Sequence, residues 1–273
     1  MLKRDGFKAD IAFNLNPSPA SRRFINFLMR DRTMTKITDY FQGVYAVNLP
    51  EREDRRQLIV QELEEAGMPL MPHKVEIFPA IRPDEAGGFP SIGARGCFSS
   101  HVAILKQAKQ QGLSNILIVE DDLEISPKLR THQAVILEQL CQQDWDFVYF
   151  GHVEEVEQKS PVTLVPFSEP MRTTHFYAVN GRIFDRLLQF LEELQHRPLG
   201  HPDGGPMHLD GAYSTFRVQN PDVVTLIASP NLGWQRSSRS DISPNSWDRI
   251  PGLRQLAGAA RTSNTRLKGW ISS

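Results

Sequence analysis

Cysteine is scarce in this sequence, which has only Cys97 and Cys141, and neither stands in a metal-type pair. A disulfide framework or a zinc site is therefore not expected, and a reducing cytoplasm is the expected location. No apolar run reaches the roughly 18 residues that would cross a bilayer, and the first residues lack the apolar core of a secretory signal. No internal repeat is visible. These absences leave a soluble globular protein as the expected class.

The composition is that of a folded protein, with 40% hydrophobic and 23% charged residues over 273 positions. This length favours one large α/β domain over two small ones. Turn-forming residues are frequent near the beginning, and a basic, polar stretch ends the chain. We therefore expect an N-terminal extension at 1–42, one folded domain at 43–242 and a basic C-terminal tail at 243–273.

Positive charge is concentrated at the two ends. Residues 1–38 carry 8 Lys and Arg against 3 Asp, and residues 249–273 carry 5 Lys and Arg and no acid. Basic ends can attract anionic lipid, which would place the protein peripherally at the inner face of a membrane. The alternative, which the sequence favours, is a pair of solvated termini. No nucleic-acid partner is expected.

The stretch from Ile116 to Ile125, ILIVEDDLEI, combines two opposite environments. Its first four residues form an apolar run that is typical of a strand buried on both faces of a parallel sheet. Glu120, Asp121 and Asp122 follow at once, and such adjacent carboxylates are costly unless a cation or hydrogen-bond donors neutralise them. A hard divalent ion such as Mg²⁺ or Mn²⁺ would do so. A solvated acidic turn is the alternative.

Strand and helix patterns alternate along the chain. This order predicts an α/β protein with an open, mostly parallel sheet flanked by helices and joined by right-handed crossovers. Residues 82–95 and 196–206 are expected loops, and the first is a candidate lid. The expected strands are 43–49, 75–81, 116–119, 147–150, 163–167, 176–179 and 223–228, and the expected helices are 54–66, 101–111, 127–143 and 182–195.

Seven short strings occur in a fixed order between about Gly43 and Ile242. Each is weak alone, but the ordered set is specific. The strings are VNLPEREDRR at 47–56, PAI at 79–81, GCFSSH at 96–101, IVEDDLEI at 118–125, DWDFVYFG at 144–151, YAVN at 177–180 and LDGAY at 209–213. Together they resemble glycosyltransferase family 25, which includes lipopolysaccharide β-galactosyltransferases and procollagen galactosyltransferases.

The resemblance implies a GT-A type nucleotide-sugar fold and transfer with inversion. It also implies a hexose donor, expected to be UDP-galactose, with Mn²⁺ or Mg²⁺ as cofactor. The expected acceptor is a cell-surface glycan or lipopolysaccharide precursor, which can be lipid-linked. Two other classes stay open, namely a non-catalytic relative that binds a sugar nucleotide or glycan, and a metal-dependent phosphohydrolase. Retention of the EDD triplet argues against the first, and no nucleophile or phosphate clamp beyond these acids supports the second.

Donor-binding residues are expected after the first two strands. Asn48 can hydrogen-bond a uracil edge or ribose, and Arg52 and Arg55 can meet diphosphate oxygens. The alternative is that these arginines pair with the neighbouring acids of the segment 51–54. Ala80 is small and stands at a strand end, where it either lets the nucleotide base approach the backbone or merely packs.

His101 is expected in the first turn of a helix, whose N-terminus can receive phosphate through free N–H groups. A lone histidine more often orders a loop through a hydrogen bond. The family's GC…SH string leaves both readings open for His101. Cys97 in the same string is expected to be a buried packing residue.

Glu120 and Asp122 stand in the place of the family's acidic metal motif. Asp121 is expected to bind the ribose or the sugar instead. Enzymes of this fold commonly add a third metal ligand from the C-terminal half. His208 is the candidate for it, with His152 as its rival, and the resemblance fixes neither.

Asp210 is the expected catalytic base. Inversion needs a group that takes the acceptor's hydroxyl proton, and a carboxylate that coordinates a metal is a poor proton acceptor. Asp210 follows the loop 196–206 and matches the family's acid in LDGAY. The chain departs from the family here, because it has His-Leu-Asp where Pro-Val-Asp is common. The alternative is that Asp210 only caps a helix.

Overall fold

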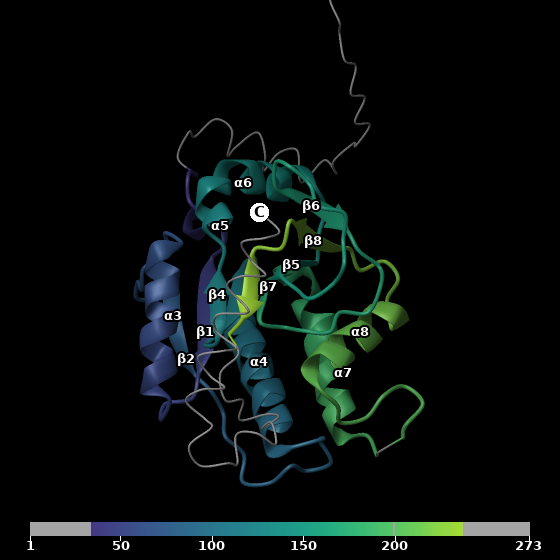
Figure 1. Ribbon diagram of the computed structural model, residues 1–273. Coiled ribbons are helices and arrows are strands. Elements are labelled where there is room, and N and C mark those ends of the chain that lie inside the picture. The colour runs from purple at the N-terminus through teal and green to yellow at the C-terminus, as the bar shows by residue number, and fades with distance from the viewer. Residues whose placement is uncertain (1–33, 199, 237–273) are drawn as a thin grey trace, which may run out of the picture.

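A seven-stranded sheet forms the centre of the computed structural model, which describes residues 34–198 and 200–236. The strands lie in the order β2-β1-β3-β7-β5-β8-β6 (Figure 1). A second sheet pairs two short strands, β4 and β9. The strand bounds are β1 Gly43–Asn48, β2 Val75–Pro79, β3 Asn115–Glu120, β4 Leu123–Ile125, β5 Phe147–Gly151, β6 Thr163–Pro166, β7 Phe176–Asn180, β8 Thr225–Ser229 and β9 Gly233–Gln235.

Five strands of the large sheet run in one direction. β1 pairs in parallel with β2 and β3, and β5 pairs in parallel with β8. The other two strands, β7 and β6, are antiparallel to their neighbours. The expected α/β architecture, a mostly parallel open sheet flanked by helices, is confirmed. One strand departs from the expected succession, because β7 follows β5 and β6 in the chain and yet lies between β3 and β5.

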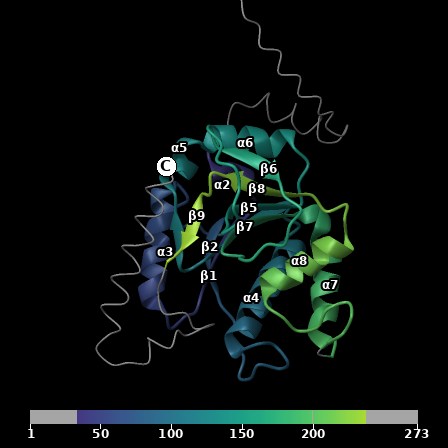
Figure 2. The ribbon, with the colours of Figure 1, turned by 45° about the vertical axis from the view of Figure 1, so that its right-hand side comes forward.

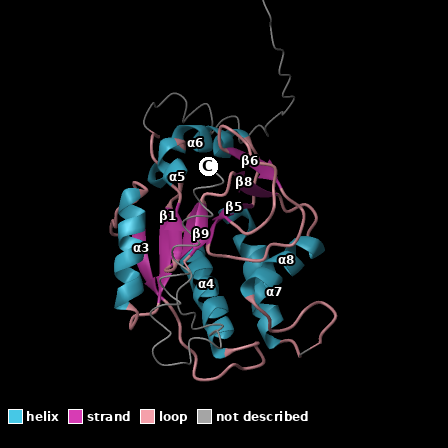
Figure 3. Ribbon diagram, in the orientation of Figure 1, coloured by secondary structure: helices cyan, strands magenta, loops and turns pink. Residues whose placement is uncertain are grey.

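Helices cover both faces of this sheet (Figure 3). The side chains of β3 alternate between two hydrophobic cores, with Ile116 and Ile118 in one and Leu117 and Val119 in the other. The first core includes α4, α7 and α8, which lie together in Figure 2, and the second includes α2, α3 and α6. The helix bounds are α2 Ile37–Tyr40, α3 Glu53–Glu65, α4 Ile92–Gln110, α5 Pro127–Thr131, α6 Gln133–Gln142, α7 Phe184–His196 and α8 Leu209–Gln219, with a 3₁₀ turn at Gly181–Ile183.

Two helix ends carry the residue types that such positions favour. Gly67 follows α3 with a φ of 81°, the left-handed conformation that glycine adopts without strain. Ser126 caps α5 by accepting a hydrogen bond from Lys128 N at 3.3 Å, and Pro127 is the first helical residue. The single helix expected at 127–143 is wrong, because the chain breaks at His132 into α5 and α6.

The start of α4 was also predicted wrongly. This helix begins at Ile92, where the side chain of Ser91 accepts a hydrogen bond from Ala94 N at 3.0 Å. The sequence predicts the start at His101 and a loop at 82–95. Gly96 explains the close fit of this first part of the helix, since a Cβ there would lie 2.7 Å from the carbonyl oxygen of Ile81.

Several expectations concern the ends of the chain. Ile37 and Phe41, inside the segment assigned to the extension, are buried in the second core. Residues 1–33 of the proposed extension and the basic tail at 243–273 lie outside the described residues, and the peripheral membrane contact stays a prediction. Within 34–198 and 200–236, no helix combines the length and the apolar character that crossing a bilayer requires.

Buried His175 predicts an acid-sensitive fold. Its Nε2 lies 3.2 Å from the carbonyl oxygen of Gly233, and burial lowers its pKa to about 4. An unfolded histidine has a pKa near 6.5, so the unfolded state gains its proton first as the pH falls from about 6.5 to 4. The free energy of unfolding should therefore drop in this window, by up to about 1.4 kcal/mol per pH unit from this residue. Urea unfolding at a series of pH values should show a shallower drop for His175→Gln, and parallel curves for the two proteins would contradict the assignment.

Candidate functional site

The carboxyl ends of β1, β2 and β3 form one edge of the large sheet. Asn48 ends β1 beside Pro79, the last residue of β2, and Val47 pairs with Glu120, the last residue of β3. The chain turns at residues 121–122, and β4 then leaves the edge to pair with β9. The strand ends therefore bring together side chains that are far apart in the sequence, as expected for an α/β sheet.

A cleft of about 370 Å³ lies at this edge. Its walls come from the strand ends, from the segment after β2 and from the first half of α4. The volume falls within the roughly 300–1,000 Å³ that small-molecule sites occupy. Six of the expected site residues line the cleft, namely Arg55, Ala80, His101, Glu120, Asp121 and Asp122.

A smaller cavity of about 120 Å³ adjoins the cleft. His208 and Asp210, at the start of α8, line this cavity. Cys97, Glu120 and Gln235 line both spaces. Two further candidate residues thus lie close to the acidic group, although their roles stay predictions.

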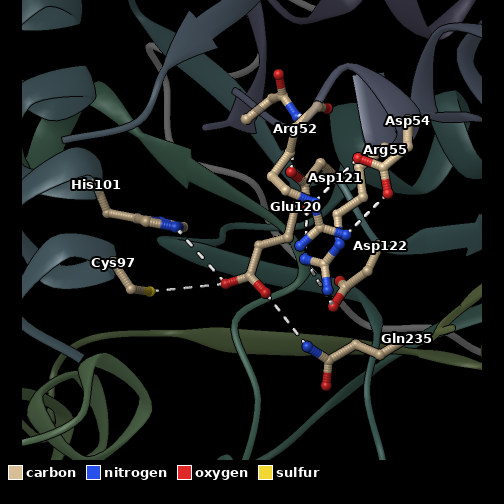
Figure 4. Close-up of polar contacts among 10 residues, drawn as sticks. Arg52, Asp54, Arg55, Cys97, His101, Glu120, Asp121, Asp122 and Gln235 are labelled. Carbon is tan, nitrogen blue, oxygen red and sulfur yellow. Dashed lines mark hydrogen bonds and ion pairs between the residues drawn. The ribbon is translucent and has the colours of Figure 1, made fainter. Parts of the chain in front are cut away.

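Asp121 is held by protein groups on both of its oxygens (Figure 4). Its Oδ2 accepts a hydrogen bond from Asn48 Nδ2 at 2.7 Å, and its Oδ1 accepts one from Arg55 Nη1 at 3.0 Å. Asn48 in turn accepts a hydrogen bond from Arg56 Nε at 3.0 Å through its own side-chain oxygen. These residues therefore hold one another in place, and a direct donor contact by Asn48 or Asp121 stays a prediction.

Arg52 shows the pairing that the sequence offered as an alternative. Its Nε and Nη2 donate to the two carboxylate oxygens of Asp54 at 3.0 and 2.9 Å. These hydrogen bonds hold the pKa of Asp54 down at about 2. The diphosphate contact predicted for Arg52 is untested.

Glu120 and Asp122, the outer two acids of the triplet, have little positive charge near them among the described residues. Arg55 Nη1 is 3.9 Å from Asp122 Oδ2 and closer to Asp121, so one arginine serves two acids. Burial raises the pKa of Glu120, and the charges of Asp122 and Asp121 raise it further. Burial also raises the pKa of Asp122 against the opposing effect of Arg55. Among the described residues, nothing hydrogen-bonds Asp122 Oδ1, which is buried. A cation with oxygen preference fits this place.

Glu120 contacts β9 through one carboxylate oxygen and α4 through the other. Its Oε2 accepts a hydrogen bond from Gln235 Nε2 of β9 at 3.2 Å. Its Oε1 is 3.8 Å from Cys97 Sγ and 3.8 Å from His101 Nε2, both on α4 (Figure 4). Single ligand atoms of Cys97, His101 and Glu120 all lie within 4.8 Å of one another.

His101 does not occupy the first turn of its helix, so its expected place at a phosphate-binding helix N-terminus is wrong. It lies nine residues after Ile92, with its ring fully buried. Its Nδ1 is 2.7 Å from the hydroxyl oxygen of Tyr177. Burial lowers the pKa of His101 to about 3, so the ring is neutral. The N-terminus of α4 itself borders the cleft, at Ile92 and Gly93.

The two histidines proposed as third metal ligand lie in different places. His208 precedes the first residue of α8 and lines the small cavity with Glu120. His152 is buried, and its Nε2 is 2.8 Å from the carbonyl oxygen of Ala228 at the end of β8. The position of His208 favours it over His152 as a ligand near Glu120.

Asp210 is half-buried in the first turn of α8. The residue at the N-cap position is His208, and the side chain of Asp210 accepts a hydrogen bond from the next backbone N–H, that of Gly211, at 2.7 Å. Burial raises the pKa of Asp210. Asp210 is not the N-cap residue, but its side chain bonds a first-turn N–H that has no acceptor within the helix, so the cap and the base both stay predictions.

Two residues of the site were not found from the sequence. Cys97 packs against the first core as expected, but it also lines the cleft, and its spacing of four from His101 places both on one face of a helix. Gln235 belongs to β9, a strand of three residues that lies beyond the last expected strand, 223–228. Its contact with Glu120 depends on the pairing of β9 with β4, for which the sequence carries no periodic signal.

Comparison with known proteins gives a family match. A model described as glycosyltransferase family 25 (LPS biosynthesis protein) matches residues 41–189. A "Glycosyltransferase 25 family member" of Drosophila pseudoobscura pseudoobscura is 28% identical over 176 residues, 56% of this chain and 27% of that protein. "Procollagen galactosyltransferase 1" of Danio rerio is 31% identical over 153 residues, 49% of this chain and 25% of that protein.

A human relative carries a different name, "Inactive glycosyltransferase 25 family member 3", and is 23% identical over 137 residues, 44% of this chain and 23% of that protein. The matched part of the chain thus spans about a quarter of the length of these curated relatives. Among solved structures, a glycosyltransferase involved in the glycosylation of the major capsid of PBCV-1 aligns with 82% of this chain and 98% of its own, at 11% identity and a TM-score of 0.48.

The contacts of Arg55 predict a measurable coupling. Arg55→Met removes the charged partner of buried Asp121, which should lower the free energy of unfolding by on the order of 3 kcal/mol. Adding Asp121→Asn should recover part of this loss, because the uncompensated charge is then gone. Arg52→Met, which breaks a more exposed pair, should cost less than about 1 kcal/mol. Urea unfolding measures all four proteins, and a double variant no more stable than Arg55→Met would refute the coupling.

Proposed function

Because the chain belongs to glycosyltransferase family 25, we propose that it is a metal-dependent, inverting glycosyltransferase. Its proposed donor is UDP-galactose, and its proposed acceptor is a cell-surface glycan or lipopolysaccharide precursor. The family relationship supports a nucleotide sugar and a glycan as the two substrates. The name of the Danio rerio relative supports galactose as the transferred hexose.

The observation that carries this proposal is the uncompensated acidic end of β3. Glu120 and Asp122 face the cleft with raised pKa values, and the buried Oδ1 of Asp122 has no hydrogen-bond partner among the described residues. We assign Mn²⁺ or Mg²⁺ to these two carboxylates, with His208 as a further candidate ligand. The ion would neutralise the diphosphate that leaves the donor.

Other residues in and next to the cleft have proposed roles in binding the donor. Arg55 and Asn48 fix Asp121, so the turn after β3 keeps its shape when the donor arrives. Ala80 lines the cleft beside the strand ends, where a small side chain leaves room for the nucleotide base. For Asp121, which lines the cleft, we propose a contact with the ribose or the sugar of the donor.

Asp210 is the proposed base. It lines the cavity that adjoins the cleft at Glu120, so an acceptor there would lie next to a donor held by the acidic group. Its raised pKa makes it a better proton acceptor than an ordinary aspartate. The acceptor hydroxyl would give its proton to Asp210 as its oxygen attacks the anomeric carbon, and the bond to the diphosphate breaks.

The name of the human relative keeps one alternative in view, which is a protein that binds a sugar nucleotide without turnover. Both acids of the proposed metal site are present in this chain, and this favours the enzyme. Product analysis by mass spectrometry separates the classes: a new glycoside and UDP support transfer, bound but unconsumed donor supports a binding protein, and free phosphate supports a hydrolase.

Asp122→Asn tests the metal assignment. The amide removes one negative charge from a crowded acidic group, so the fold should be kept while turnover falls below detection. Thermal stabilisation by UDP with Mn²⁺ should be lost as well. Asp144→Asn, at an exposed position on the protein surface, is the matched control. Full turnover of Asp122→Asn, or of the wild type in excess chelator, would exclude the assignment.

Asp210→Asn separates base catalysis from a structural role. The amide can still accept the hydrogen bond from Gly211 N but cannot take a proton, so kcat should fall about 10²–10⁴-fold. The melting temperature and the stabilisation by donor and metal should stay near those of the wild type. Asp185→Asn, in the first turn of α7, is the control with an equivalent helix position. A kcat within about twofold of the wild type would leave Asp210 with a structural role only.

A further inference from the structure

A second group of ligand atoms lines the cleft beside the oxygen-rich site. Cys97 and His101 lie one helical turn apart on α4, and both face Glu120 (Figure 4). The thiol sulfur, the imidazole Nε2 and a carboxylate oxygen lie within 4.8 Å of one another. No step of the proposed transfer mechanism uses the thiol of Cys97 or the imidazole of His101.

His101 supplies an observation that points to a ligand. Its side chain is fully buried, yet its Nε2 has no hydrogen-bond partner among the described residues. An unpaired buried nitrogen is costly, by about 1–3 kcal/mol. The nitrogen is directed toward Cys97 and Glu120, so an ion among the three would satisfy it.

The spacing of the three groups fits a tetrahedral ion. With bond lengths of about 2.3 Å to sulfur and 2.0–2.2 Å to nitrogen and oxygen, tetrahedral Zn²⁺ holds its ligand atoms roughly 3.4–3.6 Å apart. Glu120 Oε1 is 3.8 Å from both Cys97 Sγ and His101 Nε2. The Glu120 oxygen is therefore within a few tenths of an ångström of this spacing from both partners, and Cys97 Sγ and His101 Nε2 lie within 4.8 Å of each other.

The surroundings of His101 also suit a metal ligand. Its Nδ1 lies 2.7 Å from the hydroxyl of Tyr177, whose oxygen lies 2.9 Å from that of Tyr213. When Nδ1 donates to Tyr177, Nε2 keeps its lone pair and the ring orientation is fixed. Metal-binding histidines commonly have such a partner on the second nitrogen.

We propose that Cys97, His101 and Glu120 form a Zn²⁺ site on the wall of the cleft, with its fourth position open to the cleft. Thiolate and imidazole ligands favour Zn²⁺ over Mg²⁺ and Mn²⁺, which prefer oxygen. Binding forms a zinc–sulfur bond and releases the thiol proton of Cys97 to solvent. The sequence alone gave no expectation of this site.

Occupation of this site has a consequence that rests on the proposed function. Glu120 is shared, because it is also one of the two carboxylates assigned to Mn²⁺ or Mg²⁺. An ion held by Cys97 and His101 would draw the carboxylate of Glu120 away from Asp122. Zn²⁺ would therefore inhibit transfer supported by Mn²⁺, and the cleft would respond to the zinc concentration of its surroundings.

Zinc binding is tested without substrate, by titrating the full chain with Zn²⁺ against a chromophoric chelator. The wild type should bind one Zn²⁺ that depends on Cys97, and Cys97→Ser should weaken this binding more than about 100-fold, since loss of even an outer partner costs 10–100-fold. Cys141→Ser, which changes the other free cysteine on α6, should bind as the wild type does. Equal binding by Cys97→Ser and the wild type, or no stoichiometric binding by the wild type, would overturn the site.

A second measurement uses only the wild type, so it does not depend on the folding of a variant. Iodoacetamide alkylation with and without Zn²⁺ is followed by peptide mass spectrometry. Zn²⁺ should protect Cys97 and leave Cys141 in the same molecule unchanged, and equal protection of both or neither would overturn the site. Inhibition of transfer is then measured separately: if no transfer occurs in any condition, the proposed function fails while the binding results still decide the zinc site.

Discussion

The main constraint on the site is the free energy that it costs to place three carboxyl groups at the end of a buried strand. β3 is buried along its length, and its last residue, Glu120, begins the acidic triplet. Asn48 and Arg55 bond both oxygens of the middle acid, Asp121, whereas Glu120 accepts a hydrogen bond from neutral Gln235 and Asp122 lies 3.9 Å from Arg55. Burial and mutual repulsion then raise the pKa values of the other two acids, Glu120 and Asp122. In the proposed function, a cation bound by these two acids would neutralise them and hold the diphosphate of the donor.

The sequence indicated the parts of this site that depend on local patterns. A β-branched run followed by acids placed Glu120 at a strand end, and the chain order of strands and helices predicted a mostly parallel sheet. Long-range pairing was not predictable in the same way. β7 separates β3 from β5, and β9 brings Gln235 to Glu120, because of packing between segments distant in the chain. Likewise, the start of α4 was missed because the glycines and prolines of 82–95 outweighed the cap at Ser91.

The helix α4 connects the two metal-binding possibilities of the cleft. Because α4 begins at Ile92, His101 lies in the core and not at the start of the helix. The hydroxyl of Tyr177 orients its ring there. Cys97 lies one turn before His101 on the same face of α4, next to Glu120. One carboxylate is therefore within reach of both an oxygen-rich and a sulfur- and nitrogen-containing ligand set. The identity of the bound ion would then decide whether Glu120 works with Asp122 or with α4.

Anomalous diffraction from crystals grown with Mn²⁺ and UDP tests the central claim most directly. The account predicts a manganese peak within coordination distance of Glu120 and Asp122 carboxylate oxygens, in contact with the diphosphate and inside the cleft at the end of β3. A nucleotide bound elsewhere, or bound in the cleft with no manganese at these two carboxylates, would contradict it.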